Sequence, residues 1–169
     1  MKFRYHITAA DLFCFLEYHV WHSMSCLMAV MIPVLAIVGG IVSFHAQNTK
    51  RGVIYLVIGL GFTLAFHIQL LYRSIRQAKM SQSLAGQLAM ELKEEGLVIL
   101  QGEQTAEVAW KDMGKLRKTG SLILLYTDPI HSYLIPKKHL ELLDDNNQPL
   151  PSNAEDWKKV YEYIEERIG

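Results

Sequence analysis

The chain has few cysteines and no excess of basic residues, and each of these shortages excludes a class of protein. Only two of the 169 residues are cysteines, and Cys14 and Cys26 are not spaced as a CxxC. A disulfide-stapled secreted fold is therefore excluded, and apolar packing is the expected role of both thiols. Lys plus Arg equal Asp plus Glu at 17 each, so the chain lacks the basic excess that nonspecific nucleic-acid binding requires.

Sequence motifs of the common enzyme classes are absent as well. The chain contains no GxxxxGK[ST] phosphate loop and no HExxH, GxSxG or CxxC. Glu17, His19 and His22 are close in sequence, but they crowd a single helix without a clear fourth ligand for a metal. The sequence therefore predicts a protein that is not an enzyme and that needs no cofactor or metal.

Charged side chains are also missing from two long apolar runs, residues 23–44 and 52–72. Each run has about the 20 residues that a helix needs to cross roughly 30 Å of hydrocarbon. We predict two transmembrane helices, joined by the polar stretch 44–52 into an antiparallel hairpin. The alternative, a pair of core helices in a soluble protein, would leave too little polar surface to cover them. Small residues should let the two helices approach closely, namely Ala36, Gly39, Gly40, Gly59, Gly61 and Ala65.

Basic residues flank these runs unequally. Two lie in the connector, Lys50 and Arg51, whereas five lie on the other side, Lys2, Arg4, Arg73, Arg76 and Lys79. Cytoplasmic flanks of membrane spans are enriched in Lys and Arg. We therefore expect both termini in the cytoplasm and the connector outside.

His67 and Gln69 are strongly polar side chains well inside the second run. An ionisable group at membrane depth is a candidate functional site, here for a proton or a ligand. The alternative is hydrogen bonding to the neighbouring helix or at the interface. We favour the alternative, because neither run contains Asp, Glu, Lys or Arg to complete a relay.

The first 22 residues predict a strand followed by an amphipathic helix that leads into the membrane. Apolar and polar side chains alternate from Phe3 to Ile7, which is the period of a half-buried strand. Thr8 and Asp11 have the spacing of a capping box that starts a helix. This strand should pair with an edge of a sheet formed by the later part of the chain.

Beyond residue 79 the sequence changes to short apolar stretches separated by Gly-containing and Asp-Pro turns. Consecutive stretches of this kind predict an antiparallel sheet, with Trp110 plugging its core. The predicted strands are residues 87–92, 97–101, 105–110, 114–119, 121–126 and 132–135.

Residues 153–168 predict an amphipathic helix that closes this sheet. Ser152 and Glu155 have capping-box spacing, and one helical stripe carries Trp157, Val160, Tyr161, Ile164 and Ile168. A small antiparallel sheet closed by such a helix is the outline of a pleckstrin-homology-like domain, here residues 80–169. The predicted fold class is therefore an α+β membrane protein, a transmembrane hairpin bearing a β-rich domain.

Several segments together resemble a known family. They are "ITAADLFCFLEY" near the start, the paired apolar runs, "AWKDMGKLRKT", and "LILLYTDPIHSYLIPKKHL". On these segments the chain is similar to the YcxB-like family of small bacterial membrane proteins over nearly its whole length. The resemblance implies a multi-pass protein of the bacterial cytoplasmic (inner) membrane with a cytoplasmic domain. It brings no catalytic residues, because the biochemical role of the family is largely undefined.

The charge of the two halves suggests where a partner binds. Residues 80–169 carry ten Lys or Arg against fifteen acids, a balance of −5, yet most of the basic residues fall in two stretches. We expect these stretches to form a surface for a protein partner or for anionic lipid headgroups. Alternatives are an immunity protein against a membrane-acting toxin, or a subunit of an oligomeric transporter or channel. The candidate surface comprises Lys111, Lys115, Arg117, Lys118, Lys137 and Lys138.

Overall fold

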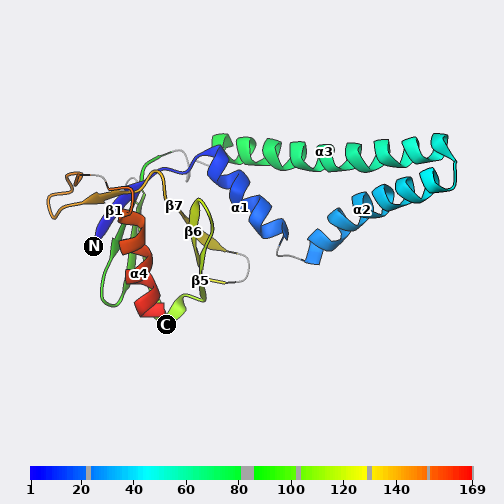
Figure 1. Cartoon of the computed structure of the whole chain (residues 1–169). Coiled ribbons are helices and arrows are strands. Elements are labelled where there is room, and N and C mark those ends of the chain that lie inside the picture. Colours follow the sequence, from blue (N-terminus) through cyan, green and yellow to red (C-terminus); the bar gives the residue numbers. More distant parts are fainter. Residues whose placement is uncertain (22–23, 81–85, 102–103, 129–130, 152, 169) are drawn as a thin grey trace. The chain divides into compact units, whose positions relative to one another are not determined.

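The computed structural model divides the chain into two compact units (Figure 1). The first unit contains Met1–Leu12 and Gln77–Gly169, and the second contains Phe13–Arg76. The structure describes all residues except 22–23, 81–85, 102–103, 129–130, 152 and 169, and it leaves the side chains of residues 24–29 undescribed. The α+β fold class expected from the sequence is confirmed at the level of helices and antiparallel sheets.

The first unit contains two antiparallel sheets rather than one continuous meander. The larger has the strand order β4-β3-β2-β1-β8, and the smaller has the order β5-β6-β7. A short helix, η1 (Trp110–Asp112), separates β4 from β5. The strands are β1 (Lys2–Tyr5), β2 (Leu88–Leu92), β3 (Gly96–Gln101), β4 (Gln104–Ala109), β5 (Lys115–Lys118), β6 (Leu122–Tyr126), β7 (Ser132–Pro136) and β8 (Glu141–Leu143).

Strand β1 lies inside the larger sheet, and the expectation that it would pair at an edge was wrong. Phe3 is opposite Met90 of β2 on one side and opposite Leu142 of β8 on the other. The sequence did not predict β8, the strand that lies on the other side of β1. Three residues are too few for a period-2 pattern to be recognised. Phe3 is fully buried, so β1 supplies part of the core.

The core of the first unit is formed by strand residues and one helix stripe. Leu122, Ile123, Leu124 and Leu125 of β6 are all fully buried, as expected of a strand that is covered on both faces. The predicted role of Trp110 is confirmed: its side chain is buried, and its indole N–H donates to the carbonyl of Lys93 at 3.1 Å.

Helix α4 (Asp156–Ile168) closes the unit and starts later than predicted. The carboxylate of Asp156 accepts a hydrogen bond from the backbone N–H of Asn153 at 2.8 Å, and the Asn153 side chain accepts one from Glu155 N–H. These bonds hold residues 153–155 in a turn ahead of the helix. The predicted cap residue Ser152 lies outside the described residues. Val160 and Ile164 are fully buried, which confirms the centre of the stripe.

The second unit consists of helices. Helix α1 (Ala9–Trp21) begins in the first unit and continues into the second, where α2 (Met24–His45) and α3 (Thr49–Met80) follow. The predicted capping box at the start of α1 is confirmed. The Asp11 carboxylate accepts the Thr8 backbone N–H at 2.9 Å, and the Thr8 hydroxyl oxygen accepts the Asp11 N–H at 3.3 Å.

The connector between α2 and α3 is shorter than the polar stretch suggested. Only residues 46–48 are outside the helices, so Lys50 and Arg51 belong to the first turn of α3. The side-chain oxygen of Asn48 accepts the backbone N–H of Arg51 at 3.3 Å, which is how an N-cap starts a helix. The polar stretch in the sequence predicted where the connector lies, but the Asn48 cap determines where it ends and α3 begins. Helix α3 also extends to Met80, past the predicted boundary at residue 72.

Small residues let α2 and α3 approach closely, as predicted for this pair of helices. A Cβ added at Gly59 would lie 3.3 Å from both the Ala36 Cβ and the Pro33 carbonyl oxygen, and one added at Gly40 would lie 3.3 Å from the Gly52 carbonyl. Gly61 was expected to belong to this contact, but no heavy atom lies within 4 Å of its Cβ position. The structure therefore confirms close approach at Gly40 and Gly59 and not at Gly61.

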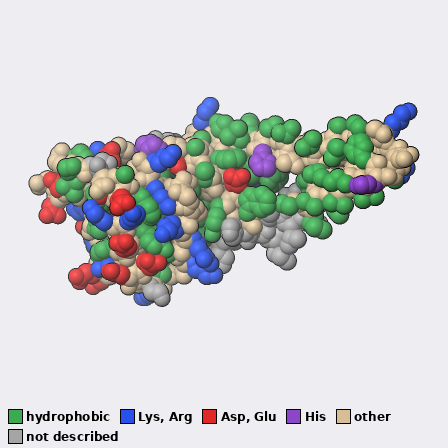
Figure 2. Space-filling model, in the orientation of Figure 1, with side chains coloured by type: hydrophobic (Ala, Val, Ile, Leu, Met, Phe, Trp, Pro, Cys, Tyr) green, Lys and Arg blue, Asp and Glu red, His purple; other side chains and the backbone are tan. Residues whose placement is uncertain are grey.

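Helix α3 is long and apolar enough to cross a membrane. Among the described side chains, the apolar part of α2 runs from Val30 to His45 and is shorter. Hydrophobic side chains are spread along the visible surface of the helical unit (Figure 2). Five of the most exposed are Leu35 at 60%, Val42 at 60%, Val57 at 64%, Leu64 at 63% and Ile68 at 64%.

Two glycines of the first unit give a matched test of packing. A Cβ at Gly96 would lie 2.2 Å from the Val108 carbonyl oxygen, whereas nothing lies within 4 Å of one at Gly120. Gly96→Ala should therefore lower the free energy of unfolding by about 1–3 kcal/mol through overpacking. Gly120→Ala should change it by less than about 0.5 kcal/mol, as for an open surface position. Denaturant unfolding of the full chain in micelles, followed by tryptophan fluorescence, measures both, and equal effects would contradict the β3–β4 register.

Candidate binding surface

The predicted basic residues are distributed around the smaller sheet. Lys111 belongs to η1, three others belong to β5, and Lys137 and Lys138 directly follow β7. Strands β5 and β7 both pair with β6, so the structure brings the two basic stretches into one sheet, as expected. At the β5–β6 turn, the backbone N–H of Lys137 donates to the Ser121 carbonyl at 3.0 Å.

Two of these lysines contact an aromatic pair on α4. The Lys137 Nζ lies 4.2 Å from the centre of the Trp157 ring. The Lys118 Nζ lies 4.8 Å from the centre of the Tyr161 ring and 5.7 Å from that of Trp157. An ammonium group over an aromatic face is attracted by the negative charge of the ring face. We call these four residues, Lys118, Lys137, Trp157 and Tyr161, the lysine–aromatic cluster.

Lys137 is a structural residue of this cluster rather than a free cation. Its ammonium group donates hydrogen bonds to the carbonyl of Thr119 and, at 3.3 Å, to that of Gly120. These bonds fasten the end of β7 to the β5–β6 turn. Burial holds the pKa of Lys137 below its usual value, and the positive charge of Lys118 lowers that pKa further. Lys137 was predicted to bind a partner, but these contacts already use two of its three donors.

The aromatic half of the cluster is the part that sequence reasoning missed. Trp157 and Tyr161 were assigned to the core stripe of the last helix, yet the structure leaves both only half-buried, at the rim of that stripe. Burial raises the pKa of Tyr161, as does the hydrogen bond that its hydroxyl donates to Glu165 at 2.9 Å. The amphipathic character of Trp and Tyr was the available signal, because such side chains favour half-buried positions beside cations.

The remaining basic residues of the predicted surface are exposed. Figure 2 shows several Lys and Arg side chains close together on the visible face of the first unit. The exposed members are Lys111, Lys115, Arg117 and Lys138, and Lys118 is exposed beside them in the lysine–aromatic cluster.

The start of α4 is fixed by charge as well as by hydrogen bonds. The backbone hydrogen bond from Asn153 lowers the pKa of the buried Asp156 carboxyl, and Lys159, at 3.1 Å, lowers it further. A lowered carboxyl pKa stabilises the folded state above the ordinary pKa of Asp, and that stability is lost as the pH falls through the folded-state pKa.

His67 and Gln69 do not come together in the second unit. The His67 ring bonds through Nδ1 to the Thr63 carbonyl at 2.9 Å, and its Nε2 lies 3.9 Å from the Glu17 carboxylate of α1. Gln69 is exposed on α3. The expected hydrogen bond from His67 to the neighbouring helix is not the one observed, because the acceptor is a carbonyl of its own helix, four residues earlier. Glu17 was missed as a neighbour because it lies outside the apolar runs.

Other candidate ligands do not assemble into a site among the described residues. In that part of the chain, no three His, Cys, Asp or Glu side chains are close enough to hold a metal ion. Cys14 is a half-buried free thiol, and His22 and the side chain of Cys26 lie outside what the structure describes. The ring of His19 stacks on Phe15 instead, with ring centres 5.9 Å apart.

The fold and this surface define an α+β protein with one helix suited to a membrane and a β-rich domain with a basic face. Residues 92–148 match the family model described as YcxB-like protein. The match supports the YcxB-like assignment for this segment, which runs from the end of β2 through β8 and does not include the helices of the second unit. No curated protein and no solved structure matches the chain significantly.

The effect of Lys118 on Lys137 can be measured directly. Lys118→Gln should raise the pKa of Lys137 towards its usual value, because one source of repulsion is removed while burial remains. NMR titration of the Lys137 side chain measures this pKa. Lys138→Gln is the matched control, since that exposed neighbour is not a cause of the shift and should leave the pKa nearly unchanged. An equal response to both changes would show that the two ammonium groups of the cluster do not interact.

Proposed function

We propose that this protein is a non-enzymatic binding protein of the bacterial cytoplasmic membrane. Helices α2 and α3 anchor it as a transmembrane hairpin, and its first unit is a pleckstrin-homology-like domain at the cytoplasmic surface. The domain presents its basic face to anionic lipid headgroups or to a protein partner. The observation that carries this proposal is the exposed apolar surface of α2 and α3.

That surface favours lipid hydrocarbon over water as the surrounding medium. Large apolar side chains such as Leu35, Val57 and Ile68 are at least 60% exposed. Burying one such side chain contributes about 1.5–3 kcal/mol, and more than a dozen are exposed along the two helices. Lipid hydrocarbon supplies this burial without a protein partner, and helices suit it because their backbone groups are paired internally.

The polar ends of the hairpin favour one orientation. Lys50 and Arg51 are exposed at the connector end of α3, and three exposed cations follow one another near its other end, Arg73, Arg76 and Lys79. The stronger basic flank is therefore on the side of the β-rich unit, which supports a cytoplasmic location for both termini.

The first unit supports a binding role through its architecture and charge. Two antiparallel sheets closed by α4 give the outline of a pleckstrin-homology-like domain, although no solved structure was matched. Each exposed cation near an anionic bilayer contributes about 1 kcal/mol before screening by salt. The half-buried Trp157 and Tyr161 add apolar contact area beside these cations.

The orientation is tested by labelling single cysteines in cells. In a background with Cys14→Ser and Cys26→Ser, a membrane-impermeant maleimide should label Ala46→Cys in the connector of intact spheroplasts. Asp145→Cys, in an exposed loop before α4, should be labelled only after lysis. Both sites are exposed, so their chemistry is matched. Labelling of Asp145→Cys alone in intact spheroplasts would invert the topology, and recovery of the protein in the soluble fraction would overturn the anchor.

The binding role is tested by photocrosslinking of the full chain in cells. A photoreactive residue at Lys115 or at Lys138 samples the basic face, and one at the exposed Glu162 samples the acidic side of α4 as the matched control. We expect adducts with anionic lipid or with one discrete protein from the basic positions and not from Glu162. A discrete protein would indicate an adaptor or immunity role, whereas lipid alone would indicate a domain that binds the bilayer. Equal yields from all three positions would contradict a specific basic face.

A further inference from the structure

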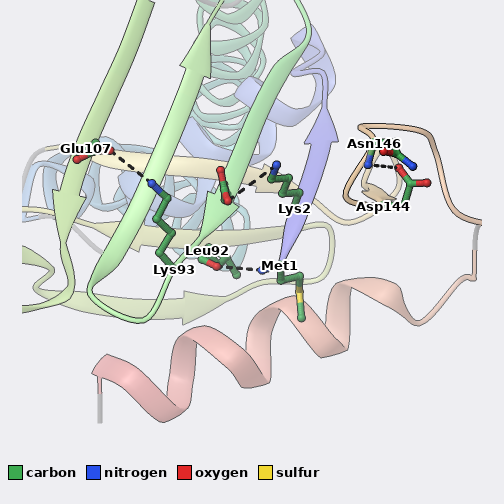
Figure 3. A network of polar contacts seen from close by, with 8 residues as sticks. Met1, Lys2, Leu92, Lys93, Glu107, Asp144 and Asn146 are labelled. Carbon is green, nitrogen blue, oxygen red and sulfur yellow. Dashed lines mark hydrogen bonds and ion pairs between the residues drawn. The ribbon is translucent and has the colours of Figure 1, made fainter.

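Strand β1 exposes a row of polar side chains on the face opposite the core. Phe3, Tyr5 and Ile7 are buried, and the residues that alternate with them are not. Lys2 pairs with Glu91 of β2 at 4.0 Å, a contact drawn in Figure 3 near the amino-terminal end of the strand. Arg4 pairs with Glu141 of β8 at 2.7 Å. Each of these two positions is therefore matched by a residue of opposite charge.

The next position in this row is His6, and it breaks the pattern because the residue that it faces is another histidine, His139. The register pairs Phe3 with Leu142 and Arg4 with Glu141, and its continuation by two residues brings His6 opposite His139. The two imidazole rings have centres 4.2 Å apart and are tilted by 38°. His6 is exposed and His139 is half-buried, so solvent reaches the pair.

The geometry points to this histidine pair as a binding site for a divalent transition metal ion such as Zn²⁺. Imidazole nitrogens bind zinc at about 2.0–2.1 Å, and two of them on a tetrahedral ion lie roughly 3.3 Å apart. The ring centres, 4.2 Å apart, are close enough for rotation of the side chains to bring one nitrogen of each ring to that separation. Imidazole ligands suit zinc, copper and nickel and do not suit magnesium or calcium.

The surroundings set the character of the site. The Glu141 carboxylate is bonded to Arg4, and the described residues contain no group of three metal-ligand side chains. Two imidazoles are therefore the protein ligands, and water completes the coordination. The ion would tie the end of β1 to the segment that precedes β8, immediately before the Thr8–Asp11 box that starts α1. Binding to the folded state alone would then stabilise the docking of β1.

Zinc titration of the full chain tests this site. The untagged protein in micelles, measured by isothermal titration calorimetry, should bind one Zn²⁺ per chain. His6→Asn and His139→Asn should each weaken binding at least tenfold. His131→Asn is the matched control, because His131 is an exposed histidine of the same unit that bonds to Asp128 instead. It should bind Zn²⁺ like the unchanged protein.

Either of two results would overturn the assignment: no saturable binding to the unchanged protein, or binding that survives both His6→Asn and His139→Asn. A paramagnetic probe keeps the test valid if a variant fails to fold. Ni²⁺ added to the unchanged protein should broaden NMR signals of His6, His139 and their neighbours first. Broadening centred on His131 or His45 would refute the site.

Discussion

The pairing of β1 between β2 and β8 is the constraint on which the first unit depends. It joins the first residues of the chain to strands more than eighty residues away, as in the bond from the Met1 ammonium to the Leu92 carbonyl, 91 positions apart. Without β1, the larger sheet would lose its link to β8 and the buried Phe3. Closing so long a loop costs chain entropy.

The end of β1 and the start of β2 lie beside each other in the larger sheet. Strand β1 ends at Tyr5 and β2 begins at Leu88, and these two residues are register partners. The capping box at Thr8 and Asp11 starts α1 within three residues of the end of β1, which leaves little free chain between sheet and helix.

The lysines of the basic face illustrate how one residue type takes two roles in one small sheet. The ammonium group of Lys137 contacts two carbonyls of the β5–β6 turn and the ring of Trp157. These contacts connect the end of β7 to that turn and to α4. Lys115 and Lys138 remain exposed. A run of Lys and Arg in the sequence does not separate these roles, because the same side chain is free or engaged according to which carbonyls and rings the fold places beside it.

Local patterns by themselves determined the apolar helices, most strands, the Thr8–Asp11 box and the buried stripe of α4, because each is a short-range period or a spacing of a few residues. The YcxB-like assignment also followed from short segments. Only the tertiary structure decided that β1 is an interior strand, that β8 exists, and that His6 faces His139. The same holds for the division into two sheets and for the contact of Lys118 and Lys137 with Trp157. These features join residues far apart in the chain, and their partners are set by register and packing, which no local period encodes.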